Sequence, residues 1–254
     1  MIRRLACCLL AWPLIAAASP PIVLQAGLGD DHRAWQAIEP ALAKDHRVIA
    51  LDRPGHGATP DTTAPRDPCT IAAEQRAQLQ SAGLSPPYVL VGHSLGGTYQ
   101  FVYAKLYPQD VAGLVLVDAT PLNHWARMQK EAPESALLLR GVKALLFSRT
   151  DRREFDDQAT CIDRLDLQQP LQLPVRVLVA GRFNAGDPPE FRAMMQRSRP
   201  TWLSLTGAPA LQTVPEAGHY IQKDQPQVVI DAIREVLAEI VAGTATPPPA
   251  ATAK

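Results

Sequence analysis

The chain of 254 residues is 46% hydrophobic and 20% charged, and its formal net charge at neutral pH is zero. This length suits a single large domain with a substantial core. The sequence has no basic block and no aromatic residues interleaved with basic ones, so nucleic acid is excluded as an expected partner and a small, roughly neutral substrate is favoured.

The first 18 residues have the pattern of a secretory signal peptide. Residues 1–4 include two arginines, residues 5–15 are apolar, and residues 16–18 are three alanines before a Ser-Pro-Pro segment. The apolar run is short for a membrane span, so we expect a secreted or periplasmic protein with no stable membrane anchor. The alternative is that this segment is left over from a misplaced start site.

The cysteines fit an exported protein without requiring one. Cys7 and Cys8 lie inside the predicted signal peptide, which leaves Cys69 and Cys161 in the mature chain. In an oxidising compartment these two can form one disulfide, and the alternative is two separate buried thiols.

Short β-branched runs bounded by glycine, proline or aspartate predict strands along the whole chain. They lie near residues 22–26, 47–52, 88–92, 113–118, 175–180 and 211–214. Helical patterns lie near residues 31–44, 70–83, 95–107 and 188–198, and a last helix follows Pro226. This alternation, with nearly continuous apolar strands, indicates an α/β fold with a mostly parallel sheet and helices on both faces. Such sheets bind ligands beyond the carboxyl ends of their strands.

Residues 120–172 interrupt this alternation with amphipathic pieces and a charged segment. An insertion of this length at the catalytic edge predicts a helical cap or lid, and the alternative is extra helices packed on the core. The tail over residues 244–254 is rich in Ala, Thr and Pro, which predicts disorder. The expected organisation is a signal peptide over 1–18, a domain over 19–243 that contains the insertion, and this tail.

The clearest functional motif lies where the third predicted strand ends. Residues 92–96 read G-H-S-L-G, after an apolar run and before a helical pattern that ends at Pro108. This G-x-S-x-G spacing raises Ser94 on a sharp strand-to-helix turn, because larger residues at the glycine positions would collide with neighbouring elements. The turn also directs the N–H of Leu95 toward the place where an oxyanion would form.

With this elbow and this order of strands, the chain resembles the α/β-hydrolase fold family from about residue 22 to residue 242. The segment 25–30 matches the oxyanion loop of that family, with Ala26 in place of the usual histidine. The resemblance implies that the N–H of Leu28 joins that of Leu95 in an oxyanion hole made of backbone donors.

Two further features follow from the same resemblance. Residues 51–57 match the D-x-P-G-x-G turn of the family, in which Asp52 and His56 are expected to be structural rather than catalytic. Most relatives carry two more strands before the oxyanion loop, which implies either a reduced member of the fold or a truncated N-terminus.

The family order of serine, acid and histidine selects His219, in a Gly-His segment after the last predicted strand, as the general base. His124 lies in the insertion and is interpreted as a surface or substrate-pocket residue. The acid is open, because the usual family position is occupied by Asn184. We favour Asp118, at a rigid strand end, over Asp187, in a Gly-Asp-Pro-Pro loop.

The sequence therefore predicts a serine hydrolase of the carboxylesterase or lipase type, which cleaves esters or related acyl bonds through an acyl-enzyme on Ser94. The mechanism requires no cofactor and no metal, and the sequence shows no motif for either. The alternative is a non-catalytic ligand-binding protein on the same scaffold, which Asn184 and the missing N-terminal strands motivate. The oligomeric state stays open.

Overall fold

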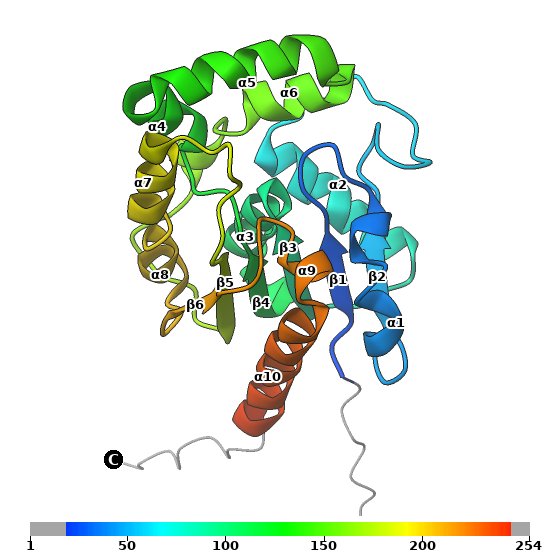
Figure 1. Ribbon diagram of the computed structural model, residues 1–254. Helices are drawn as coiled ribbons and strands as arrows, with labels where there is room; N and C mark the ends of the chain where they lie inside the picture. The colour runs from blue at the N-terminus through cyan, green and yellow to red at the C-terminus, as the bar shows by residue number, and fades with distance from the viewer. Residues whose placement is uncertain (1–18, 245–254) are drawn as a thin grey trace, which may run out of the picture.

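The computed structural model describes residues 19–244, so the predicted signal peptide and residues 245–254 of the predicted tail lie outside the described residues (Figure 1). The described residues form a six-stranded sheet in the order β2-β1-β3-β4-β5-β6, in which every neighbouring pair is parallel. The strands are β1 (Ile22–Gln25), β2 (Val48–Leu51), β3 (Tyr88–His93), β4 (Val111–Val117), β5 (Val175–Ala180) and β6 (Leu211–Val214). The predicted parallel α/β architecture is confirmed.

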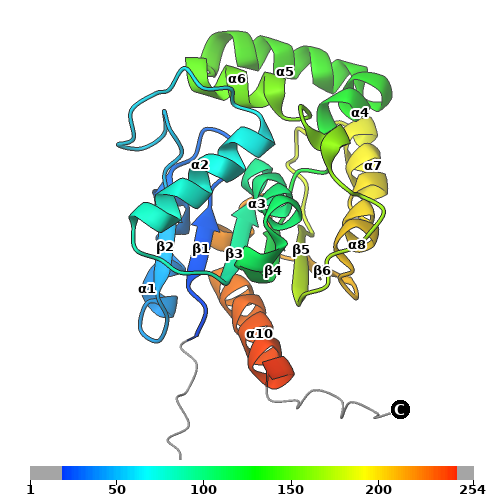
Figure 2. The same ribbon diagram turned by 180° about the vertical axis from the view of Figure 1, so that it is seen from behind.

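Helices cover both faces of the sheet, which explains why the strands read as continuous apolar runs (Figures 1 and 2). The long helix α10 (Pro226–Thr244) packs against one face, where Val229 and Ile233 are fully buried. The helices α2 (Pro68–Ser81) and α3 (Leu95–Leu106) pack against the other. Every residue of β3 is buried, so the strand that leads to the predicted elbow runs through the centre of the core.

The single helix predicted over residues 31–44 is wrong. The structure has a 3-10 helix, η1 (His32–Trp35), and one helical turn, α1 (Glu39–Leu42). Pro40 lies in the first turn of α1, and since proline cannot donate a backbone hydrogen bond, it begins a new helix rather than continuing an old one. The remaining elements outside the insertion are η2 (Pro108–Asp110), α7 (Pro189–Ser198), α8 (Thr201–Thr206) and α9 (Ile221–Asp224).

The insertion contains α4 (His124–Glu131), α5 (Pro133–Leu146), α6 (Arg149–Asp157) and η3 (Ile162–Arg164). Figures 1 and 2 show α5 and α6 side by side across the end of the molecule toward which the strands point. We call the helices α4, α5 and α6 the cap. Among residues 19–244, no helix combines the length and apolar character that a membrane span requires.

A disulfide joins the chain beyond the cap to the main domain. Cys161 follows α6 and is bonded to Cys69 in the first turn of α2, 92 residues earlier. This is the first of the two alternatives that the sequence left open. The cross-link restricts the unfolded chain and thereby stabilises the folded one.

Candidate active site

Ser94 lies between β3 and α3 in a backbone conformation that few L-residues adopt, with φ 53° and ψ −126°. Two close approaches maintain this turn. A Cβ atom on Gly96 would lie 2.4 Å from the carbonyl oxygens of Gln25 and Ala26, and one on Gly92 would lie 2.5 Å from that of Gly96. Only glycine fits at either position, so the Ser94 side chain is raised at the carboxyl edge of the sheet.

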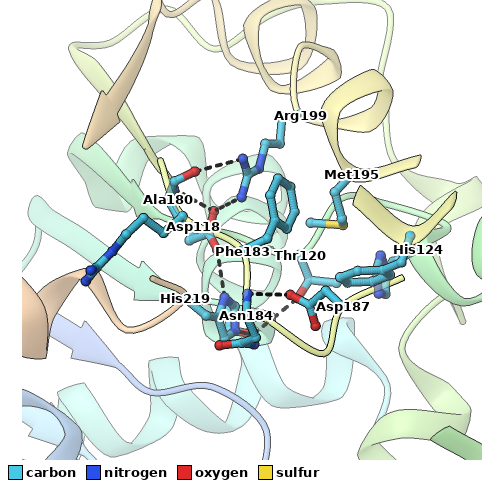
Figure 3. Close-up of a pocket in the computed structure, with 13 residues that line it drawn as sticks. Asp118, Thr120, His124, Ala180, Phe183, Asn184, Asp187, Met195, Arg199 and His219 are labelled. Carbon is cyan, nitrogen blue, oxygen red and sulfur yellow. Dashed lines mark hydrogen bonds and ion pairs between the residues drawn. The ribbon is translucent and has the colours of Figure 1, made fainter. Parts of the chain in front are cut away.

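His219 and Asp118 complete a line of hydrogen bonds with Ser94. The Nε2 atom of His219 lies 3.0 Å from Ser94 Oγ, and its Nδ1 atom lies 2.7 Å from Asp118 Oδ2 (Figure 3). Asp118 follows β4 and His219 precedes α9, so the three side chains come from separate segments of the chain. The structure thus brings together the serine, the histidine and the preferred acid that the sequence predicted.

The carboxylate of Asp118 is buried but well supplied with donors. Its Oδ1 accepts the backbone N–H of Ala180 and a guanidinium N–H of Arg199, each at 3.0 Å. Burial by itself would raise the pKa of Asp118, but the hydrogen bond and charge of His219 and the charge of Arg199 outweigh it and lower that pKa. An ionised Asp118 accepts the N–H of His219 Nδ1, which leaves Nε2 free to accept the Ser94 hydroxyl.

The other candidate acid has a different partner. Asp187 Oδ2 accepts the backbone N–H of Asn184 at 2.8 Å and so closes its own loop. Both residues line the same pocket as His219 (Figure 3), but the carboxylate against the histidine is that of Asp118.

The two predicted oxyanion donors lie beside the serine. Leu95 is the first residue of α3, so no carbonyl within the helix accepts its N–H. Leu28 follows β1, and both leucines line one pocket together with Ser94. This placement is compatible with two backbone donors at a developing oxyanion.

Sequence analysis did not identify the residues that hold the oxyanion loop in place. The guanidinium of Arg53 donates to the carbonyl oxygens of Ala26 at 2.7 Å and Gly27 at 2.8 Å, which lie two residues and one residue before Leu28. The same guanidinium forms two 2.9 Å hydrogen bonds with Glu154 of α6, and both side chains are buried. The oxyanion loop and the cap therefore share one buried ion pair.

Asp52 and His56, the turn residues expected to be structural, make hydrogen bonds outside the line of Ser94, His219 and Asp118. His56 Nε2 lies 3.1 Å from Glu154 Oε1, and Asp52 accepts the backbone N–H of His32 at 2.7 Å. Burial would raise the pKa of Glu154, but Arg53 and His56 lower it strongly. No sequence pattern identified Glu154, because its partner Arg53 lies 101 residues away.

Two pockets adjoin the serine, of about 230 and 290 Å³. Both are lined by Ser94, Thr120, His124 and His219. The first pocket has an apolar side formed by Phe183, Phe191 and Met195, and a polar side that includes Asp118, Arg182, Asn184, Asp187 and Arg199. Apolar side chains of the second pocket include Leu139, Phe147 and Phe155. Concave sites that combine apolar and polar side chains are typical of sites for small molecules. His124, interpreted from sequence as a surface or pocket residue, is a pocket residue.

Comparison with known proteins supports the same description. Residues 20–173 match the sequence pattern of the α/β hydrolase fold. The chain is 37% identical over 116 residues to the dihydrolipoyllysine-residue acetyltransferase component of the acetoin cleaving system of Pseudomonas putida, which covers 45% of this chain and 31% of that protein. It is 26% identical to the sn-1-specific diacylglycerol lipase ABHD11 of Mus musculus, over 87% of this chain and 82% of the lipase.

Solved structures agree on the fold. The epoxide hydrolase CorEH superposes with a TM-score of 0.66 at 22% identity, over 89% of this chain and 93% of that one. At this identity the likeness concerns the fold alone. The chain spans about a third of the length of its Pseudomonas putida relative and most of the length of the mouse lipase.

Proposed function

Because this chain belongs to the α/β hydrolase fold family, we propose that it is a serine hydrolase that cleaves carboxylic esters through an acyl-enzyme on Ser94. The observation that carries the proposal is the continuous hydrogen-bonded line from Ser94 through His219 to Asp118, with distances of 3.0 and 2.7 Å. A serine hydroxyl is a poor nucleophile until an oriented base takes its proton, and this line supplies such a base.

The proposed reaction has two halves. In the first, Ser94 Oγ attacks the ester carbonyl carbon while His219 Nε2 takes its proton, and the N–H groups of Leu28 and Leu95 stabilise the oxyanion. His219 then gives the proton to the alcohol oxygen as the C–O bond breaks. In the second half, His219 deprotonates a water that attacks the acyl carbon, and the proton returns to Ser94 Oγ as the acid leaves.

Esters are favoured among acyl substrates for two reasons. The pockets are small and each has an apolar side, which suits a small ester better than a polymeric substrate. The mouse relative is named as a lipase, and lipases cleave esters. Amides and lactones remain the related acyl bonds that the same residues can attack. The nucleophile position at residue 94 is a serine, so a mechanism with an aspartate nucleophile at this turn does not apply.

A fluorophosphonate probe tests the proposal directly. We expect rapid covalent labelling of wild type and of Asp187→Asn, and no labelling of Ser94→Ala. Asp187→Asn is the matched control, since Asp187 lines the same pocket but is held by Asn184. Absence of labelling in folded wild type would refute an activated serine and favour a non-catalytic binding protein.

We also propose that the mature protein is exported. The Cys69–Cys161 disulfide supports this, because disulfides persist in oxidising compartments. Intact-mass analysis of the protein from the medium or periplasm is expected to show a chain that begins near Ser19. A retained Met1 in that fraction would contradict cleavage.

A further inference from the structure

The cap contributes a histidine to the site that the proposed mechanism does not use. His124 is the first residue of α4, and its ring meets that of Phe191 edge to face, with centroids 6.4 Å apart. Its Nδ1 atom is buried and has no hydrogen-bond partner among residues 19–244. The imidazole of His124 therefore has hydrogen-bonding capacity that no residue among 19–244 uses.

The ring is neutral under ordinary conditions. Burial lowers the pKa of His124 to about 4, and the nearby charge of His219 contributes in the same direction. A neutral imidazole carries one N–H donor and one acceptor. His124 can therefore exchange a hydrogen bond with a neutral polar group without bringing a charge into the pocket.

His124 lies in the pockets where the reacting bond of a substrate would bind. His124 lines both pockets, as do Ser94, Thr120 and His219. Figure 3 shows His124 and His219 entering the first pocket from opposite sides. Whichever pocket takes the acyl group, His124 and Ser94 line the same space.

We propose that His124 is a substrate-binding residue that recognises a hydroxyl carried on the substrate near the scissile ester group. The inference rests on the proposed ester hydrolysis and adds the substrate class. A hydroxyl both donates and accepts, so it satisfies either tautomer of the neutral ring. It also adds no charge beside the apolar wall of Phe183, Phe191 and Met195.

Matched pairs of esters test whether a hydroxyl is recognised on the acyl side or on the alcohol side of the scissile ester bond. Ethyl 3-hydroxybutyrate and ethyl butyrate differ by a hydroxyl on the acyl side, and 2-hydroxypropyl butyrate and propyl butyrate differ by one on the alcohol side. We expect wild type to prefer the hydroxylated member of one pair by about tenfold in kcat/KM, the size of one neutral hydrogen bond. His124→Phe is expected to lose that preference, so that its kcat/KM values for the two members of the pair become equal.

A matched control separates substrate recognition from a structural role. His46 also has a buried, unpaired Nδ1, but it lines a different pocket, beside α10. His46→Phe should keep the hydroxyl preference, and His124→Phe should keep or raise the melting temperature, because it removes an unpaired buried polar atom.

Three results would overturn the inference: equal kcat/KM within both wild-type pairs, an undiminished preference in His124→Phe, or the same loss in His46→Phe. Turnover of plain esters with any of these results would leave the proposed function standing. No turnover of any ester, together with no fluorophosphonate labelling of Ser94, would overturn the proposed function and this inference with it.

Discussion

The carboxyl edge of the sheet and the cap hold their functional side chains in different ways. At the sheet edge, Ser94 and Asp118 have φ angles of 53° and 42°, and hydrogen bonds from neighbouring strands surround them. In the cap, α6 is tied down by buried charges, whereas α5 exposes four leucines to between 67% and 82%, namely Leu137, Leu138, Leu145 and Leu146. Chemistry is therefore expected to depend on the sheet edge and substrate choice on the cap.

Buried ion pairs of Glu154 in α6, with Arg53 at 2.9 Å and with Arg66 at 3.3 Å, join the cap to the main domain. Glu154 of α6 binds Arg53, whose guanidinium also holds the carbonyl oxygens of the oxyanion loop. The other half of the cap packs on α7 through a small apolar cluster that includes Met128 and Met194. Fewer buried contacts predict lower local stability, so α4 and α5 are the part of the cap expected to adjust to substrate.

The largest expected effect tests the sheet edge. Asp118→Asn should lower kcat by about 10⁴, because the histidine would then have the wrong tautomer and its cation would lose its partner. Asp187→Asn should keep a kcat near that of wild type, since the Asp187 side chain accepts a backbone N–H of its own loop rather than that of His219. Steady-state kinetics on one ester measures kcat for both variants. A large loss at Asp187 with little loss at Asp118 would reverse the assignment of the acid, and small losses at both would indicate a dyad.

The next largest effect tests the contact between α6 and the oxyanion loop, which is the ion pair of Glu154 with Arg53. Glu154→Gln leaves the buried Arg53 charge without its partner, so the free energy of unfolding should fall by about 3–5 kcal/mol. The oxyanion loop should also loosen and lower kcat, by less than the 10²–10³-fold cost of losing a whole oxyanion donor. Urea unfolding and steady-state kinetics measure the two.

Glu134→Gln on the exposed surface of α5 is the control for Glu154→Gln. It should change the free energy of unfolding by under about 0.5 kcal/mol. Equal effects of the two substitutions would mean that α6 is no more firmly anchored than α5.

A smaller loss is expected from the disulfide that tethers the chain after α6. Cys69→Ala with Cys161→Ala should lower the free energy of unfolding by about 2–4 kcal/mol, because the unfolded chain gains freedom over a long loop. Denaturant midpoints with and without a reductant check this. Wild type with reductant should match the double variant, and a midpoint insensitive to the reductant would contradict the prediction.

The smallest effect compares one buried histidine from each region. Burial, with repulsion from His219, lowers the pKa of His93 at the sheet edge to about 3 and that of His124 in the cap to about 4. Unfolded, both titrate near pH 6.5, so between pH 6.5 and 4 the unfolded chain binds more protons and the free energy of unfolding falls as the pH falls.

His124→Phe removes one of the two histidines that take up a proton on unfolding. It should therefore reduce the change of the free energy of unfolding with pH by up to about 1.4 kcal/mol per pH unit. Urea unfolding at several pH values between 7 and 4.5 gives the slope. A slope equal to that of wild type would mean that folding does not lower the pKa of His124.

What the sequence determined by itself is local. The six strands, the elbow at Ser94 and the Gly-His segment at His219 each depend on a few neighbouring residues, because a sharp turn or a buried strand constrains the residues that form it. The helix predicted over residues 31–44 failed for a local reason too, since the pattern was read through Pro40.

Contacts between distant segments of the chain were decided only by the tertiary structure. Asp118 and Asp187 are both acids near strand ends in the sequence, and the folded arrangement of β4 and the His219 segment brings Asp118 to 2.7 Å from the histidine. The Arg53–Glu154 pair spans 101 residues and the disulfide spans 92. Such pairs leave no local pattern, because each partner alone resembles any other charged or small residue until the sheet and the cap bring the two together.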